Sequence, residues 1–203
     1  MITRTLAAAF IAAATPLAAG AQANDNTCPT QADMQAGVLL SMDDGGFAML
    51  SRTTPAGVEV TSIVTYSDGA IARTITTFEH PLALPPQVNA QGPTFSEYEK
   101  PLAGLDGLPN TRDWVSDFRF VRDGAVVETG TQTSRLTGFG QITVGECSYD
   151  VWRVHRQIRY SDGFALYAEH VYAPSLGIIL GETTLDENGN PRAAVFFNEI
   201  MAE

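Results

Sequence analysis

Five dipeptides that favour tight turns are spread along the chain, and they constrain its fold more than any other feature. Both central residues of a tight hairpin turn must tolerate positive φ, which Asp, Asn and Gly do best. The flanking segments are rich in Val, Ile, Thr, Phe and Tyr, as strands require. The sequence therefore predicts an antiparallel β protein built from successive hairpins. The dipeptides are Asp44-Gly45, Asp68-Gly69, Asp123-Gly124, Asp162-Gly163 and Asn188-Gly189.

About ten strands follow when the segments are traced outward from these turns. They are joined mainly as a meander, which predicts an all-β curved half-barrel or barrel with little helix. Single helical turns are expected only near residues 30–35 and 96–102. The predicted strands lie near residues 36–42, 46–53, 57–66, 70–78, 114–122, 125–136, 140–160, 164–173, 177–185 and 192–200.

A proline-rich stretch separates the first four predicted strands from the rest. Because proline cannot donate a backbone hydrogen bond, residues 80–112 cannot be regular strand or helix throughout. We expect an irregular connection, which favours a flexible, lid-like loop or a boundary between two half-domains. The prolines are Pro81, Pro85, Pro86, Pro93, Pro101 and Pro109.

Residues 1–23 have the pattern of a cleavable secretory signal peptide. A basic start with Arg4 precedes an apolar run over residues 6–17, and Ala21-Gln22-Ala23 offers small residues at the cleavage positions. The apolar run is too short to cross a bilayer core of about 30 Å. We therefore expect a periplasmic or secreted protein without a transmembrane segment, whose mature part, residues 24–203, is a single β domain.

The chain is strongly acidic, with 12 basic and 23 acidic residues. Loss of Arg4 leaves 11 basic residues, so the mature net charge is about −12. Nucleic acids and anionic membrane surfaces need patches of Lys and Arg, and Lys100 is the only lysine. The charge argues against both partners, and it fits either a cationic partner or a simple role in solubility.

The two cysteines, Cys28 and Cys147, predict one disulfide, because an even pair in an exported chain is usually bonded. The alternative is a pair of redox-active thiols, which usually needs a spacing as close as C-x-x-C. We therefore expect the bond to tie the start of the mature chain to a distant strand.

The segments on either side of Asp162-Gly163 supply the candidate binding residues. A two-residue loop there would place Arg156 opposite Glu169. Because alternate residues of a strand lie on opposite faces, we expect the mostly apolar set to face inward and Arg153, His155 and Arg159 to face solvent. The ion pair lies either in a ligand cavity or at the rim of a barrel. The predicted inward-facing residues, in addition to Val154, are Trp152, Arg156, Ile158, Tyr160, Tyr167 and Glu169.

No metal or catalytic motif is apparent. The same register would place His155 opposite His170, but a zinc site needs three or four protein ligands. Residues 186–190 resemble a calcium loop, yet the glycine falls one position early and Phe197 occupies the twelfth position. We predict no metal, no cofactor and no catalytic residue, although an enzyme with a site assembled in space stays open.

The last third of the chain resembles exported proteins of the lipoprotein-carrier-like half-barrel group. Residues 145–154 enter a strand through Gly-Glu-Cys, and residues 172–177 read Tyr-Ala-Pro-Ser-Leu-Gly, an aromatic-x-Pro corner. The resemblance covers residues 140–200 and implies a curved sheet whose apolar concave face holds acyl chains or another apolar ligand. No functional residue carries over, and this chain lacks the clear N-terminal helix of that group.

Two functions are compatible with these observations. The first is an exported, non-enzymatic envelope protein that binds or chaperones an apolar ligand such as a lipid. The alternative is a structural or interaction module that docks on another envelope protein through a sheet edge or the proline-rich segment.

Our first prediction concerns the disulfide. Substituting Cys147→Ser should lower the free energy of unfolding by about 2–5 kcal/mol, because the cross-link restricts the unfolded chain. Denaturant unfolding measures the change, and non-reducing mass spectrometry tests the pairing. Two free thiols in native protein from an oxidising compartment would contradict it.

Overall fold

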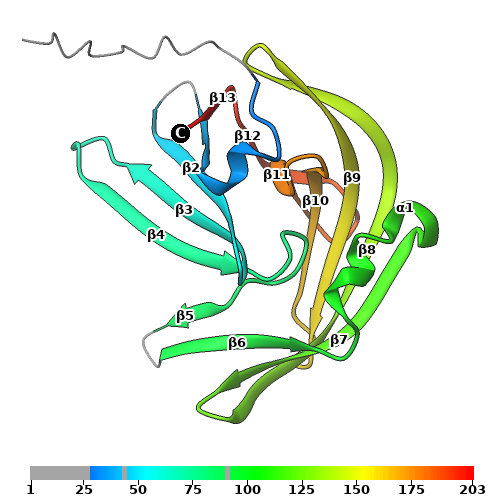
Figure 1. The fold of residues 1–203 in the computed structure, drawn as a ribbon. Coiled ribbons are helices and arrows are strands. Elements are labelled where there is room, and N and C mark those ends of the chain that lie inside the picture. Colours follow the sequence, from blue (N-terminus) through cyan, green and yellow to red (C-terminus); the bar gives the residue numbers. More distant parts are fainter. Residues whose placement is uncertain (1–27, 43–44, 90–91) are drawn as a thin grey trace, which may run out of the picture.

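The computed structural model describes residues 28–42, 45–89 and 92–203, and Figure 1 shows the chain as a ribbon. The predicted signal peptide lies outside the described residues. In the described part, thirteen strands form two antiparallel sheets, and the only helices are single turns: η1 (Asp33–Gln35), η2 (Leu102–Leu105) and α1 (Leu108–Thr111). The predicted all-β class is confirmed, and neither sheet closes into a barrel within the described residues.

The smaller sheet contains five strands in the order β13-β1-β2-β3-β4. Its first four strands in sequence form successive hairpins, and the C-terminal strand adds beside β1. The β3–β4 turn contains the predicted Asp68-Gly69, the β2–β3 turn contains none of the five dipeptides, and Asp44 lies outside the described residues. The strands are β1 (Val38–Ser41), β2 (Phe47–Thr54), β3 (Gly57–Thr65), β4 (Ile71–Phe78) and β13 (Glu199–Ala202).

The larger sheet contains eight strands in the order β12-β11-β10-β9-β8-β7-β6-β5 and is strongly curved in Figure 1. Its strands also follow one another as an antiparallel meander. They are β5 (Gln87–Asn89), β6 (Gly92–Tyr98), β7 (Asp113–Arg122), β8 (Ala125–Val144), β9 (Cys147–Tyr160), β10 (Ala165–Ala173), β11 (Ile178–Leu185) and β12 (Pro191–Phe196).

The differences from the expected strands are local and have physical causes. The strand expected over residues 140–160 is interrupted by a turn at Gly145, which has a φ of +60°. The strand expected over 192–200 is two strands in different sheets, because residues 197–198 cross from β12 to β13. A helical turn is present near residues 30–35, whereas residues 96–98 belong to β6 and the turn expected there is wrong.

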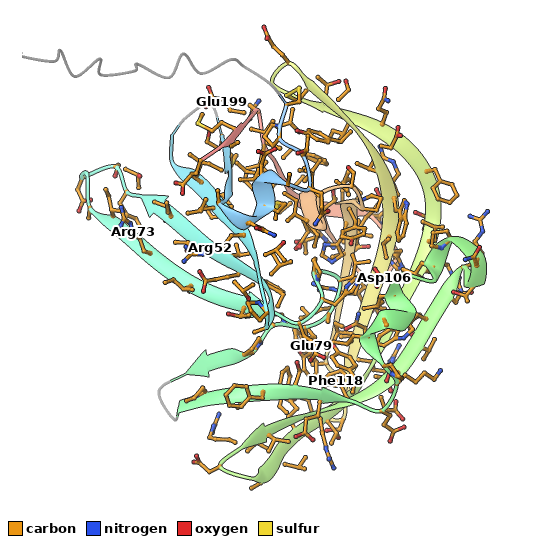
Figure 2. The ribbon with its side chains drawn as sticks, viewed as in Figure 1. Arg52, Arg73, Glu79, Asp106, Phe118 and Glu199 are labelled. Atoms are coloured by element: carbon orange, nitrogen blue, oxygen red, sulfur yellow. A yellow bond between two sulfur atoms is a disulfide. The ribbon has the colours of Figure 1, made fainter. Side chains whose placement is uncertain are left out.

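The proline-rich stretch is less irregular than expected, and its role as a lid or as a boundary between half-domains stays a prediction. It contains β5, β6, η2 and α1, and Leu82, Ala83 and Leu84 are buried. Leu82 packs with Leu108 and Val154. Glu79, labelled in Figure 2, is the first residue of the connection between the two sheets. The stretch therefore carries the chain from the smaller to the larger sheet and fills part of the space against β9.

A buried glutamine holds this stretch in place. Gln132 on β8 is fully buried, and its Nε2 donates to Leu82 O at 2.7 Å and to Ser134 Oγ at 2.9 Å. Its Oε1 accepts from the Tyr98 hydroxyl at 2.6 Å. Tyr98 OH also accepts from Leu84 N at 2.9 Å, so side chains from β6 and β8 bind the backbone of residues 82–84.

The middle of the larger sheet separates two buried clusters. Val151 and Val171 pack with Met34 and Val38, whereas Val154 and Tyr172 pack with Leu82 and other residues of the proline-rich stretch. Because alternate strand residues face opposite sides, β9 and β10 contribute to a core on each face. This arrangement explains why the face of β9 that carries Val151 is less polar than simple amphipathic alternation suggests.

The predicted disulfide is confirmed. Cys28 and Cys147 are bonded, with 5.3 Å between their Cα atoms and a sequence separation of 119. Cys147 lies in the cluster around Met34, and the Tyr149 hydroxyl donates to Pro29 O at 3.1 Å. The bond therefore fixes the start of the described chain to the end of the β8–β9 hairpin.

Our second prediction is that Gln132→Ala will lower the free energy of unfolding by about 1–3 kcal/mol, because it removes the donor to the buried Leu82 carbonyl and the acceptor for the Tyr98 hydroxyl. Gln141→Ala is the matched control on the same strand, since that side chain is exposed and bonds only Asp150. Urea unfolding of both variants provides the comparison. Equal effects would show that the network does not hold the segment.

Candidate functional site

A three-residue turn sets the register of β9 and β10. Tyr160 N donates to Phe164 O at 2.9 Å and Gly163 N donates to Tyr160 O at 3.1 Å, so Ser161, Asp162 and Gly163 form the loop. Gly163 takes a φ of +92°, as expected where a type I turn is followed by a left-handed residue. The predicted two-residue loop is therefore wrong, and the pairing shifts by one residue.

This shift moves every β10 side chain to the other face. Arg156 lies opposite Ala168, and His155 lies opposite Glu169. The predicted Arg156–Glu169 ion pair is wrong, because Glu169 accepts from Arg153 at 3.1 Å on the outer face. Tyr167 also lies on that outer face, with its ring 6.5 Å from the His155 ring.

A cavity of about 370 Å³ lies between the two sheets. Its walls come from alternate residues of β2, β3 and β4 on one side and from Arg156 on β9, His170 on β10 and four residues of β11 on the other, with Pro81 and Pro85 from the connection. These strands face one another in Figure 1. The walls are mostly apolar, and include Phe47, Met49, Val58, Val60, Phe78 and Ile179.

The inner face of the smaller sheet is well defined by its register. Ser51 pairs with Val60, and Val60 pairs with Thr76, so these lining residues share one face. Arg52 pairs with Glu59 on the opposite face through an Nε–Oε1 hydrogen bond of 2.7 Å. Figure 2 shows Arg52 and Arg73 on this sheet. The charged residues Arg52 and Glu59 thus lie outside the cavity.

Arg156 is the cationic residue of the cavity wall. Burial is the main cause that lowers the pKa of its guanidinium, and the Glu182 charge opposes this. Arginine nevertheless stays protonated in proteins. Arg156 is half-buried and borders the cavity. Its one hydrogen bond within the described residues is long, from Nη1 to Ala83 O at 3.5 Å.

His170 and Glu182 lie beside Arg156. They pair directly across β10 and β11, with His170 Nδ1 3.2 Å from Glu182 Oε2, although the approach is too oblique for a well-formed hydrogen bond. Burial and the neighbouring Arg156 charge lower the pKa of His170, while Glu182 opposes both. The His170 ring in turn holds the pKa of Glu182 below its usual range. The wall therefore carries a neutral imidazole, a carboxylate and a guanidinium near neutral pH.

The structure brings only one of the six predicted residues into this cavity. Arg156 lines it, whereas Trp152 contacts Tyr172 and the core of the proline-rich stretch. Ile158 and Tyr160 are buried beside Phe118, which is labelled in Figure 2. Tyr160 also borders a separate groove of about 650 Å³. Tyr167 and Glu169 lie outside the cavity, and contact of any of the six with a ligand stays a prediction.

Sequence reasoning missed His170, Glu182 and the whole wall from the smaller sheet. The alternation Val58-x-Val60-x-Ser62 was a usable signal, since it marks an apolar strand face. His155 and His170 lie on opposite faces, so their predicted juxtaposition is wrong. Among the described residues, no group of three or more His, Cys, Asp or Glu side chains is placed to hold a metal ion.

No family model and no curated protein sequence matches the chain. Two solved structures resemble it at 13% identity. A protein from Bacteroides fragilis, described as a candidate exported protein with a YmcC-like fold, covers 81% of this chain over 94% of its own length, with a TM-score of 0.40. The hypothetical lipoprotein YmcC from Escherichia coli covers 84% over 88% of its own length, with a TM-score of 0.41.

These likenesses are too weak to carry an argument about function. One neighbour is described as exported and the other as a lipoprotein, and neither description mentions a lipoprotein carrier or a ligand. In the part of the chain that the structure describes, no helix is both long and apolar enough to span a bilayer.

Our third prediction concerns pH. Because the pKa of His170 is lower in the folded protein than its ordinary 6.5, the folded state resists protonation. The contribution of neutral His170 to the free energy of unfolding is complete above pH 6.5 and is lost as the pH falls below that value. The free energy of unfolding changes by at most about 1.4 kcal/mol per pH unit for one proton.

Urea unfolding between pH 7 and pH 5 tests this, a window that lies above the ordinary carboxylate pKa values. We expect His170→Gln to flatten the dependence. His155→Gln is the matched control, because that ring lies on the outer face of the same sheet. Identical slopes in wild type and His170→Gln would contradict the prediction.

Proposed function

We propose that this chain is an exported, non-enzymatic protein that binds an apolar ligand in the cavity between its two sheets. The observation that carries the proposal is the cavity itself. Its volume of about 370 Å³ falls within the range of small-molecule sites, which are typically apolar with a few polar groups. The cavity has this composition, because its walls are mostly apolar and its polar groups include Arg156, His170 and Glu182.

Two observations support export and an envelope location. The Cys28–Cys147 disulfide is the kind of bond that persists in oxidising compartments. Residues 1–23 also have the pattern of a secretory signal peptide. A protein in the periplasm or outside the cell is positioned to meet lipids and other apolar molecules of the envelope.

The geometry favours binding over nucleophilic catalysis. Ser51 lines the same cavity as the His170–Glu182 pair, a combination of residue types that occurs in hydrolases. However, the Ser51 hydroxyl is sealed from solvent and has no hydrogen-bond partner in the described structure, so His170 is not placed to activate it. Both His170 nitrogens are equally sealed from solvent.

The second candidate function is an interaction module, and the edge strand β4 favours it. β4 ends the smaller sheet, and Ile71 and Ile75 are 60% and 64% exposed. Within the described residues no strand covers its outer edge, which leaves a row of backbone groups able to pair with an added strand.

Our fourth prediction tests the cavity with N-phenyl-1-naphthylamine, a neutral apolar dye that fluoresces when it leaves water. We expect saturable binding of one dye per protein. Val60→Trp should weaken it at least about tenfold by filling the cavity. Thr61→Trp is the matched control, because the adjacent residue on β3 faces away from the cavity.

Native mass spectrometry of protein isolated from the periplasm accompanies this test. A bound lipid-sized mass supports ligand binding. A stoichiometric protein partner without bound lipid favours the interaction module. No dye uptake by the wild type, or equal uptake by both tryptophan variants, would overturn the proposed cavity function.

A further inference from the structure

We infer that the cavity selects a single-chain amphiphile with an anionic head, and that the head binds at Arg156 while the apolar chain lies between the sheets. This inference rests on the proposed function and specifies its ligand class.

The unmet hydrogen-bonding capacity of Arg156 is the first argument. Its only bond within the described residues is the long contact to Ala83 O, which uses Nη1. Nε and Nη2 make none, yet they are not among the polar atoms sealed from solvent. Because Arg156 borders the cavity, these donors are available to a molecule within it. A planar guanidinium with free donors matches the two oxygens of a carboxylate or phosphate.

The charge balance is the second argument. No carboxylate of the described residues lies within 4.0 Å of the Arg156 guanidinium. Glu182, the acidic neighbour, contacts His170, and its side chain is 43% exposed, so water screens much of its charge. A buried cation without a close counter-ion is costly, and an anionic ligand head offsets that cost.

The walls supply the third argument, because they require an apolar chain as well as a head. Val58, Val60 and Phe78 line the cavity together with Ile178 and Ile179. A small anion would fill the space beside Arg156 and leave these side chains against water. A single chain with a charged end matches both parts of the cavity. Because the full sequence has a net charge of −11, the positive charge of Arg156 is a local feature of the cavity wall.

The test is displacement of the neutral dye by probes that share a twelve-carbon chain, each below its micelle-forming concentration. The probes are dodecanoate, dodecyl phosphate, dodecanol and dodecyltrimethylammonium, with acetate and inorganic phosphate as heads without a chain. We expect either anionic amphiphile to bind at least about tenfold more tightly than dodecanol, as a charge-assisted pair predicts. The two heads distinguish a carboxylate ligand from a phosphate ligand, and the chainless anions should not displace dye.

Four variants assign the selectivity to its residue. Arg156→Met should remove the anion preference while leaving dodecanol affinity nearly unchanged, and Arg156→Lys should retain part of it by keeping the charge. Arg159→Met is the matched control, since Arg159 is exposed on the same strand. Glu182→Gln should strengthen dodecanoate binding without affecting dodecanol, because it removes a nearby negative charge.

The outcomes separate the two proposals. If no apolar probe binds, the proposed function fails, and this inference fails with it. If the dye and dodecanol bind but neither dodecanoate nor dodecyl phosphate binds more tightly, or if Arg156→Met weakens all probes equally, only the inference is overturned. Thermal unfolding verifies that each variant is folded. If Arg156→Met does not fold, the wild-type probe series and Arg156→Lys still decide the question.

Discussion

The turn Ser161–Gly163 is the constraint on which the cavity between the two sheets depends. Because strand side chains alternate, one residue more or less in this loop decides whether His170 or Glu169 joins Arg156 on the inner face. The three-residue loop selects His170, and the pairing of β10 with β11 then brings Glu182 beside it. A local backbone preference of Gly163 at a φ of +92° thus determines the charges of a cavity wall formed by three strands.

The cavity also depends on how the two sheets are joined. Residues 79–86 lead from β4 to β5 at one connection, and residues 197–198 lead from β12 to β13 at the other. At the second, Phe197 lies against Phe47 of the smaller sheet, with ring centroids 6.0 Å apart. At the first, Leu82 and Leu84 fill the space against β7 and β9, whereas Pro81 and Pro85 border the cavity. The curved sheet is therefore partly filled by its own chain and partly left open.

Features with a local signal were predictable from the sequence. The turns at Asp68-Gly69 and Asp123-Gly124, the class of fold and the Cys28–Cys147 bond all follow from neighbouring residues or from a single possible pairing. The loop length at Asp162-Gly163 was not predictable, because Asp-Gly also ends three-residue loops. The facing of Val60 and Arg156 was not predictable either, since it depends on contacts between strands almost a hundred residues apart in sequence.

The proposed ligand selectivity accounts for Arg156 better than a role in stability does. An apolar residue of similar length would pack against Ile179 and Phe78 without the cost of burying a charge, and such replacements of buried charges are often neutral or stabilising. Gln132 offers the contrast within the same fold, because its polar atoms are all bonded to buried protein groups and so contribute to the folded structure. The Arg156 donors Nε and Nη2 have no such partners in the described chain. In the proposed complex, these two donors bind the anionic head of the ligand.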